Sequence, residues 1–241
     1  MSEGLGSKID FSRAPFGAPS RRFGLVSAFA LLLALPACDS AFDSSDASHK
    51  VNGNIHVAAG KPAESVNTVN GSIHVDDKAE VDSAATVNGS IHVGANAIAK
   101  SLKTVNGAIT VGEGAQASEL KSVNGELTVK DGAEIKGSLV NVNGEITVTG
   151  AHITGNIHTV AANINVLGPA KVDGGILVEK PNGTMNFGDD PTIIIGPGAT
   201  VQGELKFERK VHLYVSDHAT IGSVTGAAAV TFSGDKPPNN T

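Results

Sequence analysis

The chain has 241 residues, of which 40% are hydrophobic and 17% are charged, and its formal net charge is -6. This length and composition suffice for one domain with a sizeable hydrophobic core. Aromatic residues make up only 4% of the chain and Trp is absent, so the core must consist of aliphatic side chains. The mild acidity lacks the basic patch or high pI of nucleic-acid-binding proteins, and we expect no nucleic acid among the partners.

Residues 1–37 have the features of a lipoprotein-type signal peptide. Basic residues, including Arg21 and Arg22, precede an apolar run from Phe23 to Leu35 that is too short to remain as a membrane-spanning helix. The run ends in Leu-Pro-Ala-Cys, which resembles the bacterial lipobox, where the Cys receives lipid and becomes the mature N-terminus. Cys38 is the single cysteine of the chain, which excludes an internal disulfide. We therefore expect lipidation at Cys38; the alternative is an incidental thiol beside an ordinary signal-peptidase site.

Lipidation of Cys38 predicts a protein of the bacterial cell envelope whose partner is a membrane. Each buried CH₂ of the lipid adds roughly 0.8 kcal/mol of membrane affinity, so several chains form a permanent anchor. Asp39 follows the cysteine, and in the enterobacterial sorting scheme that this resembles, Asp favours retention at the inner membrane. We expect either the periplasmic face of the inner membrane or the outer membrane. Residues 38–50 are rich in Ser and Asp and predict a flexible tether.

From residue 51 onward the chain repeats one motif at a nearly constant interval. The Asn of each Val-Asn-Gly falls at positions 52, 70, 88, 106, 124 and 143, at intervals of 18, 18, 18, 18 and 19 residues. When the Val before that Asn is counted as position zero, positions zero, four, six and twelve are apolar in copy after copy. In one copy these residues are Val69, Ile73, Val75 and Val81. We expect all four columns to point into the core.

The Ile-x-Val alternation in each copy is typical of a β-strand, because a period of two puts both apolar residues on one face. Asn-Gly pairs could also mark the turns of an antiparallel meander. A constant offset in one chain direction instead favours an all-β fold, a three-sided parallel β-helix with 18-residue rungs, in which each rung packs on its neighbours. Residues 51–233 would form this solenoid of roughly ten rungs, about 5 nm long at about 4.8 Å per rung, and residues 234–241 a loose tail.

Asn-Gly is expected to form one corner of each rung. Gly adopts a positive φ at little cost, and Asn tolerates it better than other residues do. Stacked rungs would then place the Asn side chains in a ladder, each amide bonding its counterpart on the next rung. The predicted ladder consists of Asn52, Asn70, Asn88, Asn106, Asn124 and Asn143.

The register continues after the Asn-Gly motif is lost. Val160, Ile164 and Val166 keep positions zero, four and six, 18 residues beyond the last copy. The stretches 168–178 and 196–207 have the pattern of further rungs, with insertions near residues 181–192. We expect these rungs to extend the same coil.

Two stretches resemble known groups of bacterial β-solenoids. Residues 193–226, "IIIGPGATVQGELKFERKVHLYVSDHATIGSVTG", resemble the bactofilins, polymer-forming cytoskeletal proteins with a similar G-x-x-A-x-[VI]-x-G-x-[LIV] rhythm. The VNG repeats of residues 51–148 resemble the adhesin-type repeats of many cell-envelope proteins. The likeness to bactofilins implies a right-handed coil that joins end to end without nucleotide, and it brings no catalytic residues. Bactofilins are cytosolic, so the lipobox at Cys38 argues against an intracellular cytoskeletal role.

A column of histidines is the strongest candidate for a functional site in this sequence. His56, His74 and His92 recur at 18-residue intervals, and Thr110, Thr128 and Thr147 complete the line. On consecutive rungs the imidazoles would point outward about 5 Å apart. Two neighbouring His can bind Zn²⁺ or Cu²⁺ if a third ligand is present, and Asp76 or Asp77 could supply it. The alternative is a solvated column that was duplicated with the motif.

Enzymatic function is not expected. Hexapeptide acyltransferases resemble runs of [LIV]-G-x-x-x-x, which this chain lacks, and the acidic pair Asp189-Asp190 is explained by a turn. We expect no cofactor. The sequence favours a structural or scaffolding envelope lipoprotein that can self-associate, because terminal rungs expose unpaired strand edges. The alternative is an adhesin or a polysaccharide- or metal-binding module that uses an exposed solenoid face, although the single Tyr214 and the absence of Trp weaken sugar stacking.

Overall fold

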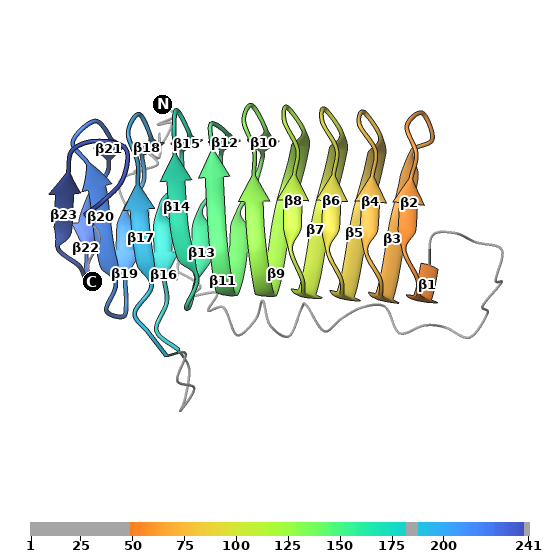
Figure 1. The fold of residues 1–241 in the computed structure, drawn as a ribbon, viewed down its shortest axis with the longest axis horizontal. Coiled ribbons are helices and arrows are strands. Elements are labelled where there is room, and N and C mark those ends of the chain that lie inside the picture. Colours follow the sequence, from red (N-terminus) through yellow and green to blue (C-terminus); the bar gives the residue numbers. More distant parts are fainter. Residues whose placement is uncertain (1–48, 182–187, 239–241) are drawn as a thin grey trace, which may run out of the picture.

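The computed structural model describes residues 49–181 and 188–238. In these residues the chain forms β-strands and no helix, and every strand pair is parallel. The strands stack into a β-solenoid of about 10 turns, which Figure 1 shows as a row of coils along one axis. The predicted all-β parallel solenoid is therefore confirmed, while its right-handed coiling and three flat sides stay predictions.

The strands fall into three stacked columns, because each coil repeats the same three strand positions. In the first coils two of these positions run together as one long strand. The long strands are β1 (His49–Asn52), β3 (Ala63–Asn70), β5 (Glu80–Asn88) and β7 (Ile98–Asn106), and the short ones are β2 (Ile55–Val57), β4 (Ile73–Val75), β6 (Ile91–Val93) and β8 (Ile109–Val111). β9 (Gln116–Val129) and β11 (Leu139–Thr149) continue through the corner.

The later coils show the three columns separately. The first column holds β10 (Glu134–Ile135), β12 (His152–Ile153), β15 (Lys171–Val172), β18 (Thr200–Val201) and β21 (Thr220–Ile221). The second holds β13 (Ile157–Thr159), β16 (Ile176–Val178), β19 (Leu205–Phe207) and β22 (Val224–Thr225). The third holds β14 (Asn163–Leu167), β17 (Thr192–Ile195), β20 (His212–Ser216) and β23 (Ala229–Phe232).

The register between coils follows the repeat that the sequence predicts. Ile73 pairs with Ile91 and Val75 with Val93 across one 18-residue period. After the Asn-Gly motif is lost, Ile146 still pairs with Ile164. Ile164 then pairs with Ile193, so the insertion between β16 and β17 lengthens one connection and leaves the ladder in place. The predicted additional rungs are confirmed.

The core is a narrow stack of aliphatic side chains, one set per coil. Ile73 and Val75 are fully buried, and Val81 is 2% exposed, so the columns at positions four, six and twelve point inward as predicted. Each buried aliphatic side chain contributes roughly 1.5–3 kcal/mol through loss of apolar contact with water. No single coil can bury its own face, so the stability of each depends on the coils above and below.

The prediction that position zero points inward is wrong. Val51 is 47% and Val69 is 37% exposed, whereas the preceding Thr68 is only 2% exposed. Val123 and Val160, at the same position of later coils, are buried but lie outside the core cluster. Period-two alternation along β3 places Thr68 on the same inward face as Val66. The Thr68 hydroxyl donates to the carbonyl oxygen of Gly53 at 3.1 Å, which satisfies the buried polar group.

This buried polar column continues along the solenoid. Thr86 donates to the Gly71 carbonyl at 2.9 Å, and Thr104 to the Gly89 carbonyl at 3.1 Å. A pattern based on apolar residues alone predicts that Thr faces outward, so it does not predict this buried column. The residues that share it are Thr68, Thr86, Thr104, Ser122, Asn141 and Thr159, all buried.

The predicted positive φ is found at only half of the corner glycines. Gly53, Gly107 and Gly144 have a positive φ, but Gly71, Gly89 and Gly125 do not. No Asn of the Val-Asn-Gly motif has a positive φ among the described residues. Gly is required at Gly71 and Gly89 because a Cβ there would overlap the backbone carbonyl of the corner one coil earlier.

The asparagine ladder forms over five of its six predicted members. The Nδ2 group of Asn70 donates to Oδ1 of Asn52 at 3.0 Å, and the same bond repeats up to Asn124, which donates to Asn106 at 3.2 Å. Asn143 pairs with Asn124 through the backbone register, but within the described chain its side chain does not extend the amide series. The extra residue of the 19-residue interval lies earlier in the coil, between Ile135 and Leu139, and leaves Asn143 opposite Asn124.

The described strands run from β1 to β23, and the division of the chain into domains stays a prediction. β1 begins at His49, two residues before the predicted start, and β23 ends at Phe232. The predicted signal peptide of residues 1–37, Cys38 and most of the tether lie outside the described residues.

Candidate metal-binding site

The predicted histidine column lies on three consecutive short strands. His56, His74 and His92 are the central residues of β2, β4 and β6, and the backbone register aligns them directly. The flanking residues of each strand are buried, and this alternation turns each imidazole outward. Thr110 continues the column after His92.

The three imidazole rings stack on one another. The ring centroids of His56 and His74 are 5.7 Å apart with an interplanar angle of 27°. His74 and His92 are closer and almost parallel, at 5.0 Å and 5°. These separations agree with the predicted spacing of about 5 Å between neighbouring parallel strands.

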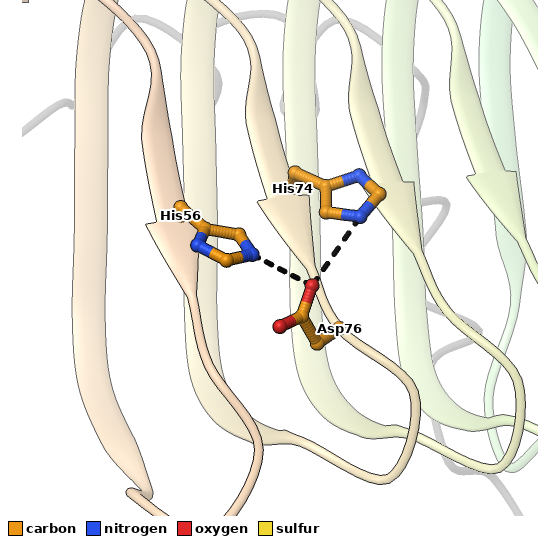
Figure 2. A group of neighbouring side chains, drawn as sticks. All are labelled: His56, His74 and Asp76. Atoms are coloured by element: carbon orange, nitrogen blue, oxygen red, sulfur yellow. Dashed lines mark hydrogen bonds and ion pairs between the residues drawn. The ribbon is translucent and has the colours of Figure 1, made fainter.

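Asp76 brings a carboxylate to the first two imidazoles (Figure 2). Its Oδ1 lies 2.7 Å from Nε2 of His56 and 3.4 Å from Nε2 of His74. One ligand atom from each of these three residues lies within 4.8 Å of the other two. Two imidazole nitrogens and one carboxylate oxygen therefore converge on the same point, at a partly exposed surface.

The turn after β4 places the carboxylate of Asp76, and not that of Asp77, beside the two imidazoles. The backbone N–H of Asp76 donates to the carbonyl of Val57 at 3.0 Å, and its carbonyl accepts from Ala79 at 3.1 Å. Asp77 points instead to the next coil, where its Oδ1 accepts the N–H of Ala95 at 2.7 Å. Of the two carboxylates that the sequence suggested, only Asp76 reaches the imidazoles.

His92 lies beside this trio and not within it. Partial burial lowers the pKa of His92, and the neighbouring His74 and Lys130 lower it further, whereas Asp77 acts in the opposite direction. His92 is thus favoured in its neutral form, stacked against His74. The structure groups His56 and His74 of the predicted column with Asp76, one of the two carboxylates that the sequence suggested, and leaves His92 outside this group.

The remaining sequence candidates have separate positions. Cys38, the predicted lipidation site, is outside the described residues. Asp190, half of the acidic pair in the insertion, forms an ion pair with Lys210 at 2.9 Å, and its pKa is lowered chiefly by that hydrogen bond. Over the described ranges, no helix is long and apolar enough to cross a membrane.

Comparisons with protein-family models, curated proteins and solved structures gave no significant match to this chain. The resemblance to bactofilins and adhesin-type repeats therefore stays a prediction from the sequence.

Proposed function

We propose that the protein is a non-enzymatic structural lipoprotein of the bacterial cell envelope, in which Cys38 carries the lipid and the β-solenoid is a rigid rod that joins end to end with other copies. The observation that carries this proposal is that the first and last described coils each present unpaired parallel strands. Such edges are templates for pairing with another chain.

The N-terminal end of the described solenoid exposes one edge of the ladder. Within the described chain, β1 pairs only with β3, and β2 pairs only with β4. Val51, on β1, is 47% exposed. The outer edge of β2 therefore has backbone N–H and C=O groups with no strand partner among the described residues, although its side chains Ile55 and Val57 are buried.

The C-terminal end exposes the opposite edge. Across residues 188–238, β22 pairs only with β19, and β23 pairs only with β20. Ala229, on the inward column of β23, is exposed at this end. Ile221 and Val224 are only partly buried where they pack against the end of the core. This end is therefore apolar as well as open.

The two edges are complementary because they belong to the same strand column. β23 follows β20 and β17 in the column that begins with β2 and β4. A second copy can place its β2 against β23 in the same direction and so continue the ladder. Ala229 would then take the place before Ile55 in the inward column. A head-to-tail contact of this kind is heterologous and does not close, so it generates a filament.

The acidic pair in the insertion supports a non-enzymatic role. A general acid requires a raised pKa, usually through burial away from cations. Asp190 has the opposite environment, with Lys210 and Arg209 beside it and a lowered pKa. The carboxylate is suited to holding the insertion against the solenoid.

Negative-stain electron microscopy of the full-length protein in mild detergent tests end-to-end assembly. We expect filaments built from units of about 5 nm, the length of roughly ten coils. The variant A229K places a charge on the inward column at the open end and should leave single rods. V230K changes the adjacent residue, whose side chain faces the outer surface, and should still form filaments. Single rods of the unmodified protein at all concentrations, with retention on cell-wall glycan, would favour the adhesin function instead.

Membrane attachment is tested separately by the substitution C38S. We expect the unmodified protein to incorporate labelled fatty acid and to sediment with membranes. C38S should incorporate none, because Cys38 is the only cysteine of the chain. Equal fatty-acid labelling of the two proteins would contradict the proposed anchor and would leave end-to-end assembly unaffected.

A further inference from the structure

We propose that His56, His74 and Asp76 bind one divalent transition-metal ion, which links the first two coils of the described solenoid. This binding site goes beyond the structural role proposed above, and each can be disproved without the other.

The distances between the ligand atoms suit a tetrahedral ion. Zn–N bonds of about 2.0–2.1 Å place neighbouring ligand atoms of a tetrahedron about 3.3 Å apart. Nε2 of His74 and Oδ1 of Asp76 are 3.4 Å apart, and all three ligand atoms lie within 4.8 Å of one another. The 2.7 Å contact between His56 and Asp76 must lengthen by a fraction of an ångström, which a rotation of the exposed His56 side chain provides.

The donor set defines the class of ion. Imidazole nitrogen suits Zn²⁺, Cu²⁺ and similar ions, whereas Mg²⁺ and Ca²⁺ require mostly oxygen ligands. With three protein ligands at an exposed surface (Figure 2), a fourth position stays open to water or to an external donor.

The fold holds the three ligands in place before the ion binds. His56 and His74 are fixed in register by the parallel ladder between β2 and β4. The backbone of Asp76 is bonded to Val57 on one coil and to Ala79 within its own turn. Such pre-organisation reduces the entropy lost on binding.

The position of the site predicts its effect on the protein. Among the described residues, β2 has a neighbouring strand on only one side, so the first coil is where the ladder opens most readily. An ion that binds residues from both coils, and binds only when they are stacked, must stabilise that stacking. We therefore expect the ion to protect the amide groups of β2 from hydrogen exchange.

Isothermal titration of the full-length protein in mild detergent, purified with a tag free of His, tests the site with Zn²⁺ as the probe. We expect one ion per chain, and no binding of Mg²⁺. H74T and D76A should each weaken Zn²⁺ binding by roughly tenfold or more, since even outer-shell changes cost 10–100-fold. Both introduce residues found at the same place in other copies of the repeat, Thr110 and Ala58, which should preserve the fold.

The matched control is H92T, which makes the same change one coil further along the column and should bind Zn²⁺ as the unmodified protein does. Hydrogen exchange provides a second measurement, because added Zn²⁺ should slow exchange in β2 of the unmodified protein and of H92T only. The proposal is overturned if the unmodified protein shows no saturable binding, if H74T binds equally well, or if H92T abolishes binding while D76A does not.

Discussion

The carbonyl oxygen of Gly71 lies where a Cβ on Gly89 would have to be. The same oxygen accepts a hydrogen bond from the buried Thr86 hydroxyl at 2.9 Å. The two corners are thus in backbone contact, and the contact is tied to the buried polar column. A Cβ would overlap the carbonyl oxygen of the preceding corner in the same way at Gly71, Gly107, Gly125 and Gly144.

G89A is expected to destabilise the protein strongly, by about 2–4 kcal/mol, because the added methyl group must push two coils apart. The matched substitution is G53A at the first corner, where a Cβ would contact only Lys50 at 3.8 Å but the φ is +118°. G53A should cost only about 1 kcal/mol, from backbone strain alone. Urea unfolding of the three proteins measures the difference. If G89A and G53A lower the free energy of unfolding equally, then backbone conformation, and not close packing between coils, is the reason for Gly at these corners.

N88A interrupts the asparagine ladder in its middle. Asn88 donates to Asn70 and accepts from Asn106, both at 3.0 Å, so the substitution removes two hydrogen bonds at an exposed corner. We expect a loss of about 1 kcal/mol in the free energy of unfolding. N143A is the control, since Asn143 lies beyond the bonded series, and its effect should be smaller. A larger loss for N143A than for N88A would contradict the ladder as a stabilising element.

S122T should stabilise the protein. Ser122 occupies the buried Thr column, but its hydroxyl has no hydrogen-bond partner among the described residues. Thr104, one coil earlier in register, donates to a corner carbonyl at 3.1 Å. A Thr at 122 adds a methyl group that restricts χ1 and can direct the hydroxyl to the equivalent carbonyl, for a gain of about 1 kcal/mol.

The opposite change, T86V, keeps the shape of the side chain and removes the hydroxyl that bonds to Gly71. We expect it to lower the free energy of unfolding by roughly 1–2 kcal/mol, because the buried carbonyl loses its hydroxyl donor. Thermal unfolding of S122T and T86V should therefore give shifts of opposite sign. If T86V is as stable as the unmodified protein, the polar column serves only to fill space.

Two histidines make the solenoid less stable at acid pH. Burial lowers the pKa of His158, against the opposing effect of the Glu179 carboxylate, and burial together with His74 lowers the pKa of His92. Their unfolded values are about 6.5. As the pH falls through that value, the unfolded chain takes up protons first, so the free energy of unfolding decreases.

H158L tests this dependence, because Leu177 occupies the next position in the same column and Val140 the previous one. The variant should be less sensitive to pH between about 7 and 5, where neutral His158 would otherwise have to take up a proton. Unfolding by urea at several pH values measures the slope for both proteins. An unchanged slope would show that His158 does not contribute to the acid sensitivity.

Much of the fold could be predicted because the constant 18-residue period determines which residues lie opposite one another in successive coils. Positions four, six and twelve, represented by Ile73, Val75 and Val81, were placed in the core correctly, and the outward His column was also placed correctly. Val69 is apolar but faces outward, so apolar character alone does not predict burial at this position. The adjacent Thr68 is the inward residue, and its hydroxyl is bonded inside the coil.

The sequence by itself determined the period, the parallel stacking and the three apolar columns, because a coil that repeats every 18 residues brings each residue beside its own copy. Only the tertiary structure decided which carboxylate meets His56 and His74, since the turn after β4 sends Asp76 to the imidazoles and Asp77 to Ala95. It likewise decided why the corners require Gly, because the overlap is between backbones of successive coils. Periodicity specifies which residues are neighbours, whereas the direction of each side chain at a turn depends on backbone geometry that no spacing encodes.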